Sequence, residues 1–213
     1  MKLNTTITRA ALGMVAAAGL AALAACGGGS TGPVDGDMAK GAAEGAKVTV
    51  IEYASPTCGH CAAWQAETGA AFEEKYVKTN KVRFILREIP TPPVDIATAG
   101  ILLARCAGPD KYFDVMHELM ANQPEWQSGS ITPRASLIKT ANAFGINEQR
   151  FTECVTDEKA LAALETRVRA ATAAGVTGTP TFVVNGKTIT TPGSTSGTSL
   201  ADLSAAIDAE LAK

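Results

Sequence analysis

Two cysteines stand three residues apart in the stretch SPTCGHCAAW, residues 55–64, and they are the strongest candidates for chemistry in this sequence. Cys58 falls at the predicted start of a helix, and a helix N-terminus stabilises a negative charge such as that of a thiolate. Cys61 would lie three residues further on, nearer the core. This spacing predicts a redox-active dithiol in which Cys58 offers the attackable sulfur and Cys61 the sheltered one. His60 adds a hydrogen-bond donor, and its positive form would stabilise the thiolate further.

Other uses of a Cys-x-x-Cys motif fit this sequence less well. A zinc site needs four ligands, and the one histidine besides His60 is His117, in a separate predicted helix. Attachment of a c-type haem needs a histidine directly after the second cysteine, where this sequence has Ala62. A purely structural disulfide of this spacing would close almost no chain. The motif therefore favours thiol-disulfide exchange without a metal or an organic cofactor.

The elements around the motif must place it at the end of a strand. Residues 48–54 predict a strand because they are rich in β-branched side chains, and Pro56 ends it before the helix begins. Residues 81–89 predict a second strand, which Pro90 ends. Strand, helix and strand together form a βαβ unit, whose connection we expect to be right-handed.

A second group of elements completes the predicted fold. Residues 181–184 and 187–191 flank an Asn-Gly pair, which is a strong hairpin signal, and residues 199–211 predict an amphipathic helix. Between the two groups, over about residues 93–175, apolar residues recur at helical spacing. The sequence therefore predicts a mixed α/β fold in which an all-helical insertion separates a βαβ unit from a ββα unit.

The N-terminal residues resemble a bacterial export signal. Residues 1–25 carry early positive charges and then an apolar run shorter than the ~20 residues that a membrane-spanning helix needs. The run ends in Leu-Ala-Ala-Cys, which resembles a lipobox, so Cys26 would be diacylated and become the mature N-terminus. Residues 26–46 are rich in Gly and Ala and predict a flexible tether, with the folded domain over residues 47–213. The alternatives are a retained anchor helix and an ordinary cleavage site with an incidental cysteine.

Chain length and cysteine count point to one domain with a second disulfide. The 213 residues and the formal net charge of -2 suit one globular domain and leave no basic patch for nucleic acid. Once Cys26 is set aside, Cys106 and Cys154 remain besides the motif, and both fall in predicted helices. We expect them to form a disulfide that stabilises the fold by about 4 kcal/mol, with two buried free thiols as the alternative.

The motif and a segment far downstream together resemble the DsbA-like branch of the thioredoxin superfamily. The first segment is VIEYASPTCGHC, residues 50–61, and the second is GVTGTPTFVVNG, residues 175–186. The resemblance covers about residues 46–213, including the helical insertion, and implies the thioredoxin fold. It also implies that Cys58 is the nucleophile that bonds to substrate and that Cys61 is its buried partner.

The same resemblance assigns roles to residues around the disulfide. Pro180 corresponds to a cis-proline that lies against the disulfide, and the backbone of Thr179 before it would pair with a substrate peptide. Glu52 corresponds to a buried acid beneath the disulfide, a proton acceptor for Cys61. The alternative for Glu52 is an ordinary carboxylate at the edge of the sheet. His60 matches the histidine that the family has at this place in the motif.

Two residues depart from the best-known DsbA proteins. Gly59 gives the dipeptide Gly-His, as in eukaryotic protein disulfide isomerase, where those proteins have Pro-His. Thr179 stands before the proline, as in bacterial isomerases, where those proteins have valine. Both departures leave the balance between oxidase and isomerase open. The segment after Cys26 is too short for the dimerisation domain of the dedicated bacterial isomerases, so we expect a monomer and favour the oxidase.

These features predict a thiol-disulfide oxidoreductase that is lipid-anchored at the periplasmic face of the bacterial cell envelope. It would introduce disulfides into unfolded exported proteins and be reoxidised by a DsbB-like, quinone-linked membrane partner. Gly27 stands where an aspartate usually signals retention at the inner membrane, which favours the outer membrane. The alternatives are an isomerase or reductase of the same fold, a Cu(I) metallochaperone with Cys58 and Cys61 as soft ligands, and a non-catalytic envelope lipoprotein.

Overall fold

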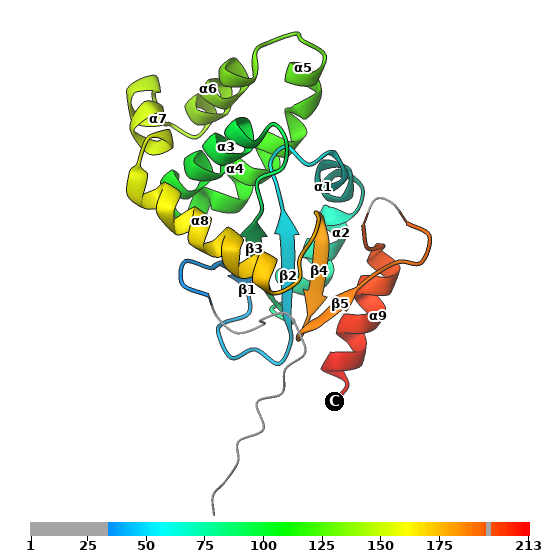
Figure 1. The fold of residues 1–213 in the computed structure, drawn as a ribbon. Coiled ribbons are helices and arrows are strands. Elements are labelled where there is room, and N and C mark those ends of the chain that lie inside the picture. The colour runs from blue at the N-terminus through cyan, green and yellow to red at the C-terminus, as the bar shows by residue number, and fades with distance from the viewer. Residues whose placement is uncertain (1–33, 195–196) are drawn as a thin grey trace, which may run out of the picture.

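The computed structural model describes residues 34–194 and 197–213, and the predictions for the export signal, for Cys26 and for the start of the tether lie outside them. A five-stranded sheet forms the centre, in the order β1-β3-β2-β4-β5. The strands are β1 (Met38–Gly41), β2 (Thr49–Ala54), β3 (Arg83–Glu88), β4 (Thr181–Val184) and β5 (Lys187–Ile189). Since β2 runs parallel to β3 and antiparallel to β4, the predicted βαβ unit and the hairpin share one sheet (Figure 1).

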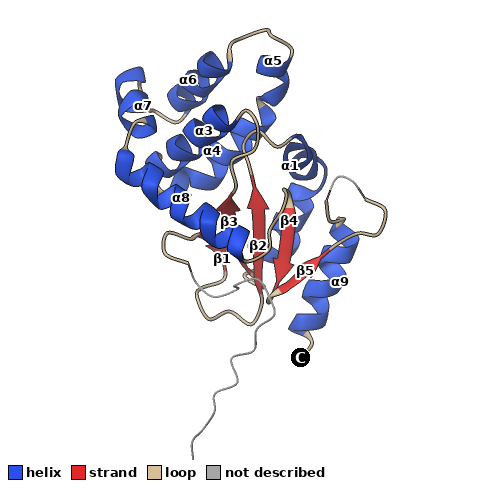
Figure 2. Cartoon of the chain, in the orientation of Figure 1, coloured by secondary structure: helices blue, strands red, loops and turns tan. Residues whose placement is uncertain are grey.

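Helices connect and cover the strands. The helical segment between β2 and β3 consists of α1 (Gly59–Trp64), η1 (Gln65–Gly69), α2 (Ala70–Phe72) and η2 (Glu73–Val77), of which η1 and η2 are π-helical. Between β3 and β4 lie α3 (Val94–Cys106), α4 (Pro109–Ala121), α5 (Gln123–Gln127), α6 (Pro133–Ala143), α7 (Glu148–Val155) and α8 (Glu158–Ala173), and α9 (Leu200–Leu211) follows β5. The predicted all-helical insertion is therefore confirmed (Figure 2). Within the part of the chain that the structure describes, no helix has the length and apolar character needed to cross a membrane.

The tether predicted for residues 26–46 is wrong in its second half, because β1 lies within it. β1 pairs antiparallel with β3 along its whole length. Just before the strand, the Asp37 carboxylate accepts hydrogen bonds of 2.9 and 2.8 Å from the Arg87 guanidinium, and both side chains are buried. The strand residues, MAKG, include no β-branched side chain, so their composition carries no strand signal. Pairing with β3 and the buried ion pair form the strand instead.

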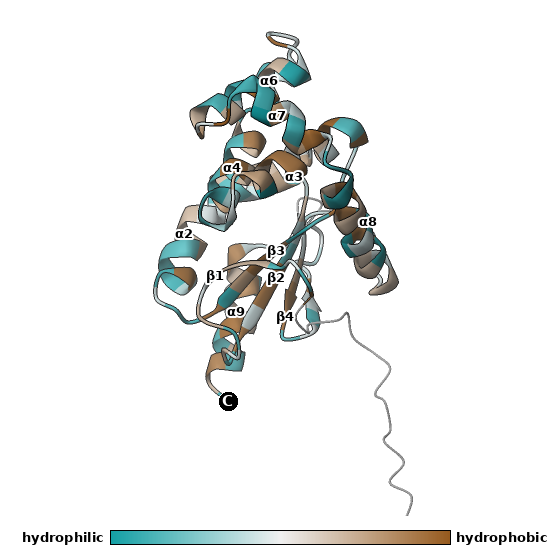
Figure 3. Cartoon of the chain, turned by 90° about the vertical axis from the view of Figure 1, so that its left-hand side faces the viewer, coloured by the Kyte–Doolittle hydropathy of each residue, from teal (hydrophilic) through white to brown (hydrophobic). Residues whose placement is uncertain are grey.

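Two hydrophobic cores flank the sheet. The larger core packs one face against α1, α4 and α9 and includes Val50 of β2. The smaller core packs Ile51 of the opposite face against Ala171 of α8. Figure 1 shows α8 crossing this second face, and Figure 3 shows the central strands and α3 mostly in the brown of hydrophobic residues. Because successive residues of a strand point to opposite faces, Glu52 belongs to the larger core and Tyr53 to the smaller one.

Candidate active site

Cys58 and Cys61 form a disulfide where β2 gives way to α1, with their Cα atoms 5.2 Å apart. Cys58 is the N-cap residue of α1, and its Sγ accepts a hydrogen bond of 3.1 Å from the backbone N–H of Cys61. This geometry places the Cys58 sulfur where the helix N-terminus stabilises a negative charge. Cys58 is 7% exposed and Cys61 is fully buried, which agrees with the predicted order of access, although even Cys58 is mostly covered.

Hydroxyl groups hold the loop that precedes Cys58. The Ser55 Oγ accepts a hydrogen bond of 3.1 Å from the backbone N–H of Thr91, and the Thr57 hydroxyl donates one of 2.9 Å to the Thr91 carbonyl. Ser55 and Thr57 are both buried. The segment that follows β3 therefore fixes the turn from which the reactive cysteine emerges, a contact that no sequence motif indicated.

The helical insertion also reaches this loop, through Gln123 of α5. Its Nε2 donates hydrogen bonds of 2.9 Å to the Pro56 carbonyl and 3.2 Å to the Cys58 carbonyl, and the side chain is 3% exposed. The Nε2 of Gln127 in turn donates to the Oε1 of Gln123 at 3.4 Å. Sequence reasoning missed Gln123 because it lies 65 positions beyond Cys58 in a short helix without a motif.

The segment after α8 brings a cis-proline to the disulfide. The Thr179–Pro180 bond is cis, and the Cys58 Sγ lies 3.4 Å from the carbonyl oxygen of Thr179. Gly197 packs behind the proline, because a Cβ at this position would lie 2.7 Å from the Pro180 Cγ. Its φ of 98° is also one that glycine adopts without strain. The structure thus brings Thr179 and Pro180 to the cysteine motif and adds Gly197, which sequence reasoning missed.

Glu52 is a buried acid on β2 and is 4% exposed. It shares a face of the sheet with Val50, in the core that also contains Cys61. Burial raises the pKa of Glu52 to about 8, while the positive charge of Lys40 acts in the opposite direction. The carboxyl group is therefore mostly protonated at neutral pH. The alternative of a carboxylate at the sheet edge is excluded, because β2 has a paired strand on either side.

Lys40 of β1 is a further charged residue on the same face as Glu52, and sequence reasoning missed it. It lies opposite Phe84 in the sheet, and its side chain is 21% exposed. The ammonium group forms an ion pair with Glu73 and lies 4.8 Å from the ring centroid of Phe113. These contacts fix the position of the charge that lowers the pKa of Glu52. No signal was available because β1 falls in the segment predicted as tether.

The two residues between the cysteines face solvent. Gly59 and His60 are exposed, and His60 makes no hydrogen bond or ion pair with any residue that the structure describes. The structure therefore does not connect His60 to the Cys58 sulfur. Across residues 34–194 and 197–213, no group of three or more His, Cys, Asp or Glu side chains is placed to hold a metal ion.

A second disulfide lies within the helical insertion. Cys106 at the end of α3 is bonded to Cys154 of α7, with their Cα atoms 5.8 Å apart. The structure therefore forms the predicted pairing, and the alternative of two free thiols is not the one it adopts. The bond joins positions 48 residues apart and ties the insertion to itself.

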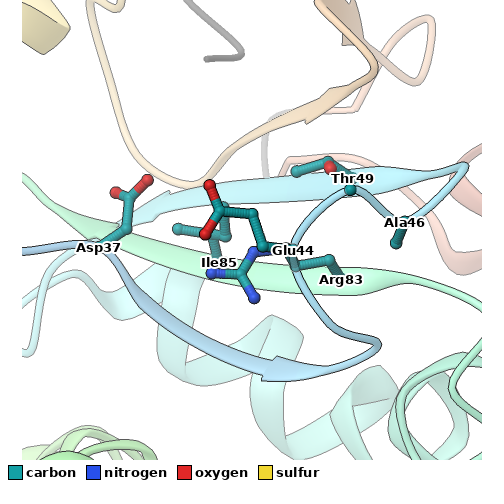
Figure 4. A pocket seen from close by; sticks show the side chains of 7 residues that line it. Asp37, Glu44, Ala46, Thr49, Arg83 and Ile85 are labelled. Carbon is teal, nitrogen blue, oxygen red and sulfur yellow. The ribbon is translucent and has the colours of Figure 1, made fainter. Parts of the chain in front are cut away.

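A pocket of about 330 Å³ lies beside Ile85, on the face of the sheet opposite the core that contains the cysteines (Figure 4). Its lining residues are Asp37, Glu44, Gly45, Ala46, Thr49, Arg83 and Ile85. Thr49 is the first residue of β2, whereas Cys58 follows the last residue of that strand. This pocket is therefore not part of the cysteine site.

The disulfide on a helix N-terminus, the cis-proline beside it and the buried acid on the central strand occur together on a sheet built from βαβ and ββα units. This combination defines a thioredoxin-fold protein with a Cys-x-x-Cys disulfide and a helical insertion. The family described as Thioredoxin matches residues 34–209, and the chain belongs to this family.

A curated relative extends this result. A protein of Rickettsia bellii, provisionally classed as a protein-disulfide oxidoreductase, is 32% identical to this chain over 163 residues. The match covers 76% of this chain and 60% of the relative, so the chain spans about three fifths of the length of that protein.

Two solved structures share the fold. The crystal structure of alpha-DsbA1 from Wolbachia pipientis superposes with a TM-score of 0.73 at 23% identity, over 84% of this chain and 93% of that chain. Oxidised BdbD from Bacillus subtilis superposes with a TM-score of 0.70 at 19% identity, over 83% of this chain and 94% of that chain. These similarities confirm the predicted DsbA-like thioredoxin fold.

Proposed function

We propose that this protein is a protein thiol-disulfide oxidoreductase that introduces disulfides into exported proteins. The observation that carries the proposal is the 3.4 Å separation between the Cys58 Sγ and the Thr179 carbonyl oxygen. It places the backbone ahead of the cis-proline directly beside the reactive sulfur. A peptide that pairs with the backbone at Thr179 presents its own cysteine to Cys58.

In the first step, a substrate thiolate attacks the Sγ of Cys58. A bond forms between the substrate sulfur and Cys58, the Cys58–Cys61 bond breaks, and Cys61 leaves as a thiolate. Glu52 is protonated at neutral pH because its pKa is about 8, and it supplies the proton that Cys61 takes up. This transfer avoids an unpaired thiolate in the core, where a charge is strongly destabilised. In reoxidation the direction reverses, and ionised Glu52 accepts the proton of Cys61.

In the second step, another substrate thiolate attacks the substrate sulfur of the mixed disulfide. The substrate disulfide forms and Cys58 leaves as a thiolate, so the substrate loses two electrons and the cysteine pair gains them. The N–H of Cys61 and the N-terminus of α1 stabilise this thiolate. Stabilising the reduced form makes the disulfide a stronger oxidant, which supports the oxidising direction.

The setting that we infer is the bacterial cell envelope. An export signal over residues 1–25 and diacylated Cys26 would hold the domain at the periplasmic face, and Gly27 favours the outer membrane. The partners would be unfolded exported proteins and a DsbB-like, quinone-linked membrane protein that reoxidises the pair, with the protein itself a monomer. Metabolic labelling with a radioactive fatty acid tests the anchor, because Cys26→Ala would lose the label.

The second candidate is an isomerase or reductase of the same fold. Thr179 favours it, because this residue lies against the Cys58 sulfur and is one of the two that depart from the best-known DsbA proteins. Equilibration of the Cys58–Cys61 pair with glutathione decides between the two. A reduction potential near about -120 mV supports the oxidase, and one near about -270 mV contradicts it and leaves the reductase. Cys58→Ser is the control, because it removes the pair that is being measured.

A further inference from the structure

A small cavity lies between α8 and the sheet, on the face opposite Glu52. It has a volume of about 40 Å³ and is lined by Tyr53, Arg87 and Arg167 on its polar side and by Val34, Ala170, Ala171 and Ala174 on its apolar side. A cavity needs roughly 10–15 Å³ to hold one water molecule. The space therefore admits a water molecule or a single small ion but no larger organic ligand.

Arg167 is one of the residues that line this cavity, and two of its nitrogen atoms have no hydrogen-bond acceptor. Its side chain is 10% exposed, and neither Nε nor Nη2 has a hydrogen-bond partner. The Nε lies 3.4 Å from the Oε2 of Glu88, too poorly aligned to form a hydrogen bond. Among the described residues, every other buried nitrogen or oxygen atom of a side chain has a hydrogen-bond partner. A buried donor without an acceptor costs about 1–3 kcal/mol, and more when it is charged.

The hydroxyl group of Tyr53 supplies a third donor. It accepts a hydrogen bond of 3.3 Å from the Nη1 of Arg87, which occupies an oxygen lone pair and leaves the hydroxyl hydrogen available. That hydrogen is donated to no group in the part of the chain that the structure describes. The polar wall of the cavity therefore offers donors from Arg167 and Tyr53 and calls for an acceptor.

Arg167 shares its counter-ion with Arg105, because both guanidinium groups form ion pairs with Glu88. Arg87 is paired with Asp37, and Arg105 donates hydrogen bonds of 2.6 and 2.9 Å to Glu88. Glu88 also accepts a hydrogen bond of 2.7 Å from the hydroxyl of Tyr112, so its oxygens are already engaged. Among the described residues of this group, the carboxylates of Asp37 and Glu88 therefore balance two of the three guanidinium charges, and one positive charge is left over. Burial lowers the pKa of Arg167, whereas the charge of Glu88 acts in the opposite direction.

We propose that this cavity is a binding site for a small monovalent anion, with chloride as the probe, held by Arg167 and Tyr53. Such an ion matches the donors, the surplus positive charge and the volume together, whereas water would leave the charge uncompensated. The bound ion links α8 to β2. The segment that carries Thr179 and Pro180 follows α8 directly. By holding α8 against the sheet, the bound ion would also help to hold that segment in place.

Chloride-35 NMR of the full-length oxidised protein tests the proposal. We expect line broadening that saturates as chloride is titrated and that bromide displaces. Arg167→Met should weaken binding by about tenfold or more, because it removes the charged donor. The variant should fold, since Glu88 keeps Arg105 and Tyr112 as partners. Tyr53→Phe, which leaves all three arginines in place, should weaken binding to a smaller extent.

Arg169→Met is the matched control. Arg169 lies on the same helix but is exposed, with an ion pair to Glu165, and its replacement should leave the titration unchanged. Two results would overturn the proposal. The first is the absence of saturable broadening in the wild-type protein, which means that water fills the cavity. The second is equal broadening in wild type and Arg167→Met, which places the ion elsewhere.

Discussion

Gln123, on helix α5 of the insertion, donates a hydrogen bond of 3.2 Å to the carbonyl oxygen of Cys58. The same amide group donates to the carbonyl of Pro56, and both contacts are buried. Because these carbonyls belong to the turn that presents the cysteine, the insertion helps to set the geometry of the reactive sulfur. The insertion therefore contributes a side chain that supports the turn carrying Cys58.

Gln123→Ala leaves two buried carbonyls without a donor, so the free energy of unfolding should fall by about 1–3 kcal/mol. A looser loop also weakens the contact from the Cys61 N–H to the Cys58 sulfur, which is strongest when that sulfur is a thiolate. We therefore expect a less oxidising reduction potential, measured by equilibration with glutathione. Gln127→Ala is the control, because the hydrogen bond of Gln127 goes to Gln123 rather than to the loop. Equal potentials in the two variants would contradict the positioning role.

We expect Glu52 to make the stability of the oxidised protein fall as the pH rises. Its pKa is about 8 in the folded protein against 4.5 ordinarily, so between these values the folded state retains a proton that the unfolded state releases. The folded state therefore loses up to about 1.4 kcal/mol of stability for each pH unit in this window. Glu52→Gln should abolish this loss, as measured by denaturant unfolding at about pH 5 and about pH 8. A variant that keeps the wild-type slope would show that another group causes it.

Lys40→Met should raise two pKa values together, because the charge of Lys40 lowers both of them. The pKa of Glu52 should rise above about 8, and that of His117 above about 4. NMR titration of the His117 ring resonances reports the second shift directly. Lys75→Met is a suitable comparison, since Lys75 is exposed and paired with Asp208. An unchanged His117 titration in Lys40→Met would rule out the electrostatic role.

Gly197→Ala should disturb the cis-proline segment. The new Cβ would lie 2.7 Å from the Pro180 Cγ, in a conformation that alanine adopts only with strain. Gly193→Ala isolates the strain, because Gly193 also has a positive φ but no atom within 4 Å of the added Cβ. We expect about 1–2 kcal/mol of destabilisation for Gly193→Ala and a larger loss for Gly197→Ala. Gly197→Ala should also slow exchange with a cysteine peptide, and equal rates in both variants would argue against the contact.

Removal of the second disulfide by replacing Cys106 and Cys154 with alanine should lower the free energy of unfolding by about 4 kcal/mol. The loss arises because the bond closes a long loop and restricts the unfolded chain. Denaturant unfolding of the oxidised double variant measures it, with the reduced wild-type protein as the comparison. Thiol-disulfide exchange at Cys58 should persist in the folded variant. A loss near zero would mean that the unfolded chain is already compact around these helices.

Local sequence patterns were sufficient for the elements and residues that depend on neighbours along the chain. Cys58 and Cys61 were identifiable because their spacing combines with a strand end and a helix start, and the Asn-Gly hairpin was identifiable because Asn185 and Gly186 adopt the positive φ values of that turn. Thr179 and Pro180 required the resemblance to a family, since no local rule brings them to Cys58.

Residues whose roles depend on partners far along the chain could not be predicted. Lys40 lies in a strand that exists because β3 pairs with it, and MAKG alone has the composition of a tether. Nothing in the sequence distinguishes Gln123 from other polar residues, because its two carbonyl partners lie beside it only in the folded protein. Gly197 belongs to no motif or periodic pattern, and its role depends only on its contact with Pro180 in the folded protein. In each case tertiary packing assigns the role.

The edge strand β1 also determines how the domain responds to mechanical force. A pull on the chain at Val34 is transmitted to Asp37, which accepts a hydrogen bond of 3.0 Å from the Val34 N–H and forms a buried ion pair with Arg87 ahead of the strand. Behind it, the β1–β3 hydrogen bonds lie side by side along the strand, so a force directed along β1 loads them together in shear. The cysteine pair is attached to β2, which β3 separates from β1. We therefore expect a force applied along β1 to act on its pairing with β3 before it reaches the strand that carries the disulfide.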